Sequence, residues 1–135
     1  QMNAKDIAQN VIKEHRIGVL STSKVDKPNA RYMVFYNDGL ELYTKTSDET
    51  NKVDEIEENP NVHVLLGYSE PNKKEYIEVR GTAKIVDDEK TIEWIKDVQQ
   101  KTRIEDSATL QVIHIKPEQM IVHSPSLDQP EVVTV

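Results

Sequence analysis

The alternation of apolar and polar residues predicts short strands with three helices set between them. Residues 3–15 fit an amphipathic helix capped by Asn3, and two further helices are expected to begin near residues 46–48 and 87–88. The segments between the helices alternate with the period of strands. Strands are predicted over residues 17–23, 30–37, 40–44, 62–68, 76–86, 110–115 and 119–123.

Turn-forming residues predict how these elements are connected. Asp38-Gly39 favours a tight hairpin, and the polar residues 24–29 predict a loop. Gly81 lies within a long strand and predicts a bulge or a close backbone approach. Hairpin connections make the sheet largely antiparallel, and the strand spacing fits a small barrel. The expected fold class is therefore mainly β with α, that is, α+β.

The chain is expected to form one domain over residues 1–123, followed by a tail, residues 124–135, that fits an arm or a disordered segment. Hydrophobic residues make up 36% of the chain and aromatic residues 5%, with one Trp and one Phe. A domain of this size buries only about two-thirds of the surface of its unfolded chain. We therefore expect a partner subunit or a ligand to bury part of the surface.

Charge and composition exclude several classes of protein. The 17 Lys and Arg residues stand against 24 Asp and Glu residues, and this net charge of −7 argues against a nucleic-acid binder. The absence of Cys excludes disulfides and thiolate metal sites. No apolar run approaches the roughly 20 residues that cross a bilayer, and no secretory leader is visible. A cytoplasmic protein without a membrane partner is expected.

No protein-based catalytic machinery is visible. The four histidines, at 15, 63, 114 and 123, form no close ligand pair, so no metal site is predicted. The chain lacks a Gly-x-Ser-x-Gly elbow, and its four glycines cannot build a phosphate-binding glycine-rich loop. We predict no catalytic residue.

One candidate anion site lies where the third strand leads into the second helix. Free backbone N–H groups and the positive end of the helix dipole meet there, and Lys52 can reach back toward a phosphate. The hydroxyl-bearing residues of this junction are Thr44, Thr46, Ser47 and Thr50. An ordinary capped helix is the alternative, because Asp48 and Glu49 are favourable at a helix start without a ligand and would repel a phosphate.

A second candidate is Arg31, which begins a strand rich in aromatic and β-branched residues. Alternation places Arg31 and Met33 on one face of this strand. It places Tyr32 and Val34 on the other face. The Arg31 guanidinium could hold a phosphate in a bidentate manner, and a snorkelling side chain at a sheet edge is the alternative.

Four stretches of the chain carry a family resemblance. They are Ile17-Gly-Val-Leu-Ser-Thr-Ser before a Lys-Pro-Asn-Ala turn, Ala30-Arg-Tyr-Met-Val, Leu42-Tyr-Thr-Lys-Thr-Ser with Asn-Lys-Val-Asp-Glu-Ile56 and Asn59-Pro-Asn-Val62, and Tyr76-Ile-Glu-Val-Arg-Gly-Thr-Ala83. In this order they resemble the pyridoxamine 5′-phosphate oxidase-like FMN-binding split β-barrels, in the small general-stress-protein subgroup. The resemblance covers residues 5–123.

This resemblance implies a split β-barrel of about seven mostly antiparallel strands with three helices, forming a homodimer with FMN at the subunit interface. It implies that Arg31 and Lys52 contact the phosphate, and that Tyr43 and Thr44 lie near the ring or the ribityl chain. A second copy would contribute its long strand around Tyr76. The predicted cofactor-binding residues are Arg31, Tyr32, Met33, Val34, Tyr43, Thr44, Thr46, Ser47, Asn51, Lys52 and Tyr76.

The phosphate loop departs from the family pattern. Relatives commonly read Thr-Ser-Arg-Asp-Ser-Arg-Lys-Val, whereas residues 46–53 here read Thr-Ser-Asp-Glu-Thr-Asn-Lys-Val, with Asp48 and Asn51 in place of the arginines. Each lost Arg–phosphate contact costs about 1–3 kcal/mol. The tail also lacks the basic and aromatic substrate-binding segment of full pyridoxamine phosphate oxidases, so vitamin synthesis is not expected.

We therefore expect an FMN-binding flavoprotein, an oxidoreductase in which the flavin supplies the redox chemistry and NAD(P)H is a candidate electron donor. The alternatives are a non-catalytic flavin-binding stress protein, the same barrel binding heme or a deazaflavin, and a cofactor-free dimer.

Overall fold

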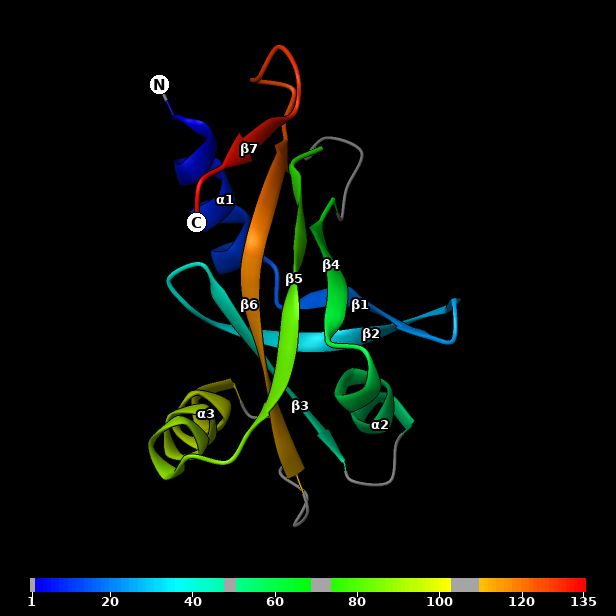
Figure 1. Cartoon of the computed structure of the whole chain (residues 1–135). Helices are drawn as coiled ribbons and strands as arrows, with labels where there is room; N and C mark the ends of the chain where they lie inside the picture. The colour runs from blue at the N-terminus through cyan, green and yellow to red at the C-terminus, as the bar shows by residue number, and fades with distance from the viewer. Residues whose placement is uncertain (1, 48–50, 69–73, 103–109) are drawn as a thin grey trace.

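A computed structural model of the chain describes residues 2–47, 51–68, 74–102 and 110–135; the side chains of residues 47, 51–52, 99–102 and 110 lie outside this description. Along the described residues, each helix is followed by two or three consecutive strands (Figure 1). They are α1 (Ala4–Glu14), β1 (Ile17–Lys24), β2 (Lys27–Asp38), β3 (Glu41–Ser47), α2 (Asn51–Glu58), β4 (Asn61–Gly67), β5 (Tyr76–Val86), α3 (Glu89–Thr102), β6 (Leu110–His123) and β7 (Glu131–Val133). Among the helices described, none is long and apolar enough to cross a membrane.

The strands form one antiparallel sheet that closes on itself (Figure 1). Its order is β3-β2-β1-β4-β5-β6-β7, and β3 also pairs with β6. This last pairing closes strands β1 to β6 into a barrel, while β7 adds to β6. The predicted fold, a mainly β split barrel of antiparallel strands with three helices, is confirmed.

Inward-facing residues of every barrel strand fill the interior. In β1 the burial alternates, so that Gly18, Leu20 and Thr22 point inward. Contributions from the other strands make a single apolar cluster with Leu20. These strand residues are Phe35, Leu42, Val62, Val64, Leu66, Ile77, Val79, Ala83, Ile113, Ile115, Met120 and Val122.

Helix α1 closes one end of the barrel (Figure 1). Its apolar side, which includes Ile7 and Val11, packs into the main core. The helix begins with a reciprocal capping box, in which Asn3 accepts from the Asp6 N–H and Asp6 accepts from the Asn3 N–H. The predicted helix over residues 3–15 is thereby confirmed with its predicted cap.

Helices α2 and α3 lie near the opposite end of the barrel (Figure 1). Helix α2 adds Ile56 to the main core. Helix α3 packs Ile95 against Tyr36 in a second apolar cluster outside the barrel. Its start matches the prediction, because the Asp88 carboxylate accepts a hydrogen bond from the Thr91 N–H at 3.1 Å. That hydrogen bonding to Thr91 lowers the pKa of Asp88.

Strands β1 and β2 form a longer hairpin than the sequence predicts. The prediction of a loop over residues 24–29 is wrong, because the strands continue to a two-residue turn at Val25-Asp26. Both turn residues have positive φ, 47° and 62°. Turns of this hand match the twist of paired strands, but Gly or Asn usually marks them, so the sequence carried no signal here.

Strand β6 continues through Pro117, so the prediction of separate strands over residues 110–115 and 119–123 is wrong. Pro117 lies opposite Gly81, next to a register shift in β5, and a proline is tolerated at such a bulge. A Cβ atom at position 81 would collide with the Lys116 carbonyl. The predicted close backbone approach at Gly81 is confirmed.

The segment after β6 folds back onto the barrel. Strand β7 pairs with β6, and Val133 is buried in the main core. Leu127 packs against the same core. The structure thus shows a paired strand where the sequence suggested an arm or a disordered tail.

Candidate functional site

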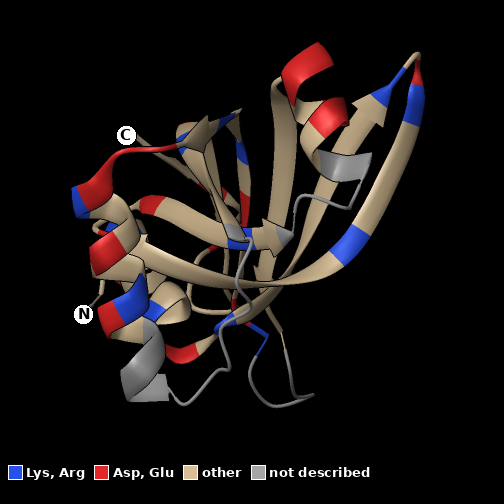
Figure 2. Ribbon diagram, turned by 90° about the horizontal axis from the view of Figure 1, so that it is seen from below, with Lys and Arg blue, Asp and Glu red and all other residues tan. Residues whose placement is uncertain are grey.

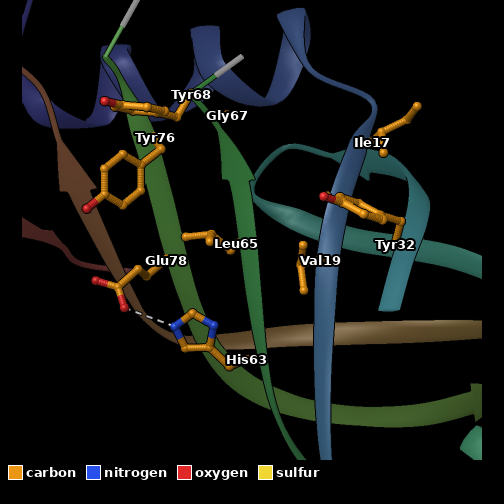
Figure 3. Close-up of a pocket in the computed structure, with 10 residues that line it drawn as sticks. Ile17, Val19, Tyr32, His63, Leu65, Gly67, Tyr68, Tyr76 and Glu78 are labelled. Atoms are coloured by element: carbon orange, nitrogen blue, oxygen red, sulfur yellow. Dashed lines mark hydrogen bonds and ion pairs between the residues drawn. The ribbon is translucent and has the colours of Figure 1, made fainter. Parts of the chain in front are cut away.

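A groove of about 720 Å³ lies on the outer face of the barrel, across β1, β2, β4 and β5 (Figure 3). Apolar and aromatic side chains supply most of its wall. The lining residues are Ile17, Gly18, Val19, Tyr32, His63, Leu65, Gly67, Tyr68, Tyr76 and Glu78. A volume of this size is typical of sites for small molecules.

Strand register explains why these side chains meet. Val19 pairs with Tyr32 in β2 and with Leu65 in β4. Leu65 in turn pairs with Glu78 in β5, so all four side chains point to one outer face. Tyr32 is 78% exposed and Leu65 is 40% exposed. This row therefore leaves a contiguous apolar surface open, which is a mark of binding surfaces.

Glu78 forms the polar end of the groove together with His63 (Figure 3), and Glu78 also contacts His123. Its two carboxylate oxygens lie 2.7 Å from His123 Nε2 and 3.0 Å from His63 Nε2. The hydrogen bond with His123 lowers the pKa of Glu78, partial burial acts in the opposite direction, and His63 lowers the pKa further. The Tyr76 ring stacks on His123 with ring centroids 4.2 Å apart. In the described part of the chain, no group of His, Asp and Glu is arranged to hold a metal ion.

Arg31 lies on the opposite face of β2, in a hydrogen-bonded cluster that reaches α2. Arg31 Nη1 donates to the Leu20 carbonyl at 3.2 Å and to the Thr22 hydroxyl at 2.8 Å. The Thr22 hydroxyl donates to the Glu55 carboxylate at 2.6 Å, and the Asn29 amide donates to the same carboxylate at 2.8 Å. Arg31 Nη2 and Glu55 form an ion pair at 3.6 Å. We call Thr22, Asn29, Arg31 and Glu55 the Arg31 cluster.

The Arg31 cluster lies beside the first turns of α2, between basic and acidic surfaces. Figure 2 shows Lys and Arg along the β1–β2 hairpin and Asp and Glu on the neighbouring helix. The Glu55 side chain is 8% exposed and the Arg31 side chain 24%. Among the residues that the structure describes, no hydrogen bond runs from Nε or Nη2 of Arg31. The Arg31 side chain thus stays partly exposed beside α2, while its Nη2 atom faces the Glu55 carboxylate.

Part of the predicted phosphate site falls outside the described residues. These residues are 48–50 and the side chains of Ser47, Asn51 and Lys52. Thr46 is described and is 4% exposed, so its side chain is buried in the barrel. The predicted second helix is present, but it begins at Asn51 rather than near residues 46–48, because Thr46 and Ser47 belong to β3. The third candidate cap, Asp48, lies outside the described residues.

Val34, Tyr43 and Thr44 lie away from the groove walls, near α3 and inside the barrel. The Tyr43 ring stacks on His114 at 4.7 Å and meets Trp94 of α3 edge-on at 5.2 Å. Burial, with a smaller effect of nearby carboxylates, raises the pKa of Tyr43. The Thr44 hydroxyl is fully buried and donates to the Val34 carbonyl at 2.7 Å. In this structure these three residues therefore pack within and against the barrel wall and do not line the groove.

Comparison with known proteins places the chain in a family. The family model described as pyridoxamine 5′-phosphate oxidase matches residues 4–124. General stress protein 26 of Bacillus subtilis (strain 168) is 42% identical over 123 residues, which cover 87% of this chain and 88% of that protein. The chain belongs to the pyridoxamine 5′-phosphate oxidase-like family. The resemblance inferred from the four sequence stretches is confirmed.

Solved structures of this family agree with the fold. A pyridoxamine 5′-phosphate oxidase-like protein from Listeria innocua has a TM-score of 0.80 and 38% identity, covering 89% of this chain and 98% of that one. General stress protein 26 from Bacillus anthracis has a TM-score of 0.79 and 32% identity, covering 99% and 100%. Both are similar over nearly their whole length, including the barrel strands that form the groove.

Within this family fold, the predicted site residues divide between several places. Tyr32 and Tyr76 both line the groove, but on opposite sides of it, because β1 and β4 lie between their strands (Figure 3). Arg31 lies behind them, in its own cluster with α2. Met33 packs against the main core, so its side chain lies inside the barrel. Within one chain, the predicted cofactor-binding residues therefore do not form one continuous site.

Sequence reasoning missed the partners of Arg31 and the polar end of the groove. A readable signal existed for Thr22, which occupies an inward position in the alternation of β1. No such signal marks Glu55, because successive helix residues point about 100° apart and the burial of Ile56 does not predict burial of its neighbour. The hydrogen bond between Thr22 and Glu55 is therefore visible only in the structure. For His63 and Glu78, only the register of β4 with β5 reveals that they meet.

Proposed function

We propose that this protein is an FMN-binding flavoprotein of its family and an oxidoreductase other than the vitamin-synthesising enzyme. The observation that carries the proposal is the Arg31 guanidinium, which is held through Nη1 and belongs to a side chain that stays 24% exposed beside α2. An arginine fork matches the oxygens of a phosphate, and helix N–H groups add to such a site. These features fit the phosphate end of a flavin mononucleotide.

Each part of the chain would contribute to holding the cofactor in a different way. Arg31 would bind the phosphate together with Lys52, Ser47 and the backbone N–H groups at the α2 start. The strand from Tyr32 to Val34 would run beside the flavin, which supplies hydride-transfer chemistry when bound. Because the flavin carries this chemistry, the chain itself needs to bind, orient and shield it.

We further propose that the working form is a homodimer. Support comes from the groove face, where Ile17 is 62% exposed, Tyr32 78% and Tyr68 52%. Exposed apolar patches of this kind are typical of surfaces that bind a partner. In a dimer built on this face, Tyr76 of one copy would approach the flavin held by the other copy.

Distant structures with this fold show that it serves several ligands. A FAD-binding protein from Mesorhizobium loti is 20% identical with a TM-score of 0.69, and a heme-binding protein from Mycobacterium smegmatis is 13% identical with a TM-score of 0.79. At these identities the similarity concerns the fold alone. We favour flavin over heme because Nε2 of His63, His114 and His123 lies within 3.0 Å of a carboxylate in each case.

The first experiment is an absorbance spectrum of the purified protein before and after FMN is added. The proposal predicts a flavin spectrum that stays with the protein after gel filtration. Oxidation of NADH or NADPH by this complex then separates an enzyme from a flavin carrier. A heme spectrum, or no retained flavin at high micromolar FMN, would overturn the proposal.

A further inference from the structure

We infer that Thr22 and Glu55 form a positioning pair that presents the Arg31 guanidinium to the phosphate of the cofactor. This inference rests on the proposed flavin function and adds residues that touch no cofactor themselves. The supporting observation is a chain of hydrogen bonds that runs from Arg31 Nη1 through the Thr22 hydroxyl to the Glu55 carboxylate.

The direction of each hydrogen bond follows from the chemistry of the three groups. The Thr22 hydroxyl has one proton, and a carboxylate oxygen at 2.6 Å can only accept it. The hydroxyl lone pairs are then left to accept from Arg31 Nη1 at 2.8 Å. Glu55 thus orients the hydroxyl, and the hydroxyl orients the guanidinium. The second N–H of Nη1 donates to the Leu20 carbonyl at 3.2 Å, so both N–H groups of Nη1 are hydrogen-bonded.

Burial makes this chain rigid. Thr22 is 3% exposed and Glu55 is 6% exposed, so water does not compete for their hydrogen bonds. Asn29 donates to the other oxygen of the Glu55 carboxylate and fixes its rotation. The cluster joins β1, β2 and α2 at one point. Arg31 is therefore held in one orientation before a phosphate arrives, which lowers the entropic cost of binding it.

The negative charge of Glu55 repels a phosphate. Any gain in phosphate affinity from Glu55 must therefore come from how it positions Arg31. A carboxylate 3.6 Å from Arg31 Nη2 neutralises part of the field that attracts an anion. A fair test therefore removes the hydrogen-bonded link without changing any charge. Thr22→Val does this at nearly constant volume, and Thr22→Ser is the matched control because it keeps the hydroxyl.

The experiment measures equilibrium binding of FMN and of riboflavin, which carries the same ring without the phosphate. The ratio of the two dissociation constants isolates the phosphate contribution. In Thr22→Val we expect FMN affinity to fall about tenfold and riboflavin affinity to stay within about twofold. Thr22→Ser should restore the ratio of the wild type. Asn29→Ala, at an exposed position that does not threaten folding, should lower the ratio by a smaller factor, about threefold.

The outcomes separate this inference from the proposal beneath it. If the wild type binds FMN no better than riboflavin, the proposed phosphate site and the positioning pair fail together. If the wild type prefers FMN and the preference survives in Thr22→Val, the positioning pair alone is refuted. Equal losses for both ligands would also refute it, because they would indicate general loosening. Should Thr22→Val not fold, an unchanged ratio in Asn29→Ala refutes the inference.

Discussion

Arg31 combines two properties that usually belong to different residues. It neutralises Glu55, which is buried, and its own side chain stays 24% exposed beside α2. A buried carboxylate without a cation is strongly unfavourable, so part of the value of Arg31 is structural. A phosphate ligand would approach the exposed part of this side chain. The same side chain therefore links the stability of the barrel to binding.

We predict that Arg31→Ala lowers the free energy of unfolding of the apo protein by about 1–2 kcal/mol, because Glu55 loses its cation but keeps two hydrogen bonds. Urea unfolding at neutral pH measures this. Arg80→Ala is the control, since Arg80 is exposed and makes one hydrogen bond, to Gln119 at 3.3 Å. It should change stability by less than about 0.5 kcal/mol. Equal effects of the two substitutions would contradict a structural role of Arg31.

Glu78 gives a prediction for the pH dependence of stability. Its hydrogen bonds to His123 and His63 lower its pKa below the ordinary value of 4.5. The stabilisation is therefore present above that ordinary value and is lost as the pH falls through the pKa of the folded state. Glu78→Gln should be less stable than the wild type near neutral pH, by less than about 1 kcal/mol because the carboxylate is partly exposed. Unfolding curves at several pH values should show this difference shrink in acid, and a difference that grows in acid would refute it.

At the level of elements, most strands and all three helices follow from hydrophobic periodicity, and the predicted caps are present in α1 and α3. The wrong predictions of strand ends and turns have local causes. The turn at Val25-Asp26 lacks the glycine or asparagine that marks such turns, and Pro117 looks like a break although a bulge accommodates it. Strand β7 is only Glu131–Val133, too short for a periodic signal. The site was harder to predict than the strands and helices. The hydrogen bond between Thr22 and Glu55 depends on tertiary packing, which residue spacing does not reveal.

The contribution of strand β7 to the folded core can be tested by substitution. Val133 is 7% exposed and belongs to the main core, whereas its neighbour Val132 is 58% exposed. Val133→Ala should therefore lower the free energy of unfolding by about 2 kcal/mol, because it removes buried methyl groups and leaves a cavity. Val132→Ala should have almost no effect in the same urea titration. Equal and small effects would mean that β7 is not part of the folded core in solution.

For the whole molecule, the main feature is an apolar outer face on a chain of net charge −7. An acidic protein with few aromatic residues still leaves Ile17, Tyr32 and Leu65 open to solvent on one side of the barrel. A second copy covering this face would bury that surface and bring two sets of site residues together. This is the basis of the proposed dimer.

We predict that light scattering finds twice the 15.5 kDa mass of the chain. Leu65→Arg should shift the protein toward the monomer, because it places an unpaired charge in the centre of the apolar row. Val135→Arg is the matched control. This residue is 49% exposed and lines a different hollow with Lys5 and Leu40. If Leu65→Arg remains as dimeric as the control, the groove face is not the interface.

We propose above all that the chain binds FMN through a phosphate held by Arg31, despite Asp48 and Glu49 just before α2 in the sequence. The most direct test of this proposal is a calorimetric titration of the purified apo protein with FMN at physiological ionic strength. We expect saturable binding with one FMN per chain, and weaker binding as the salt concentration rises. Heats no different from dilution, up to high micromolar FMN, would contradict it.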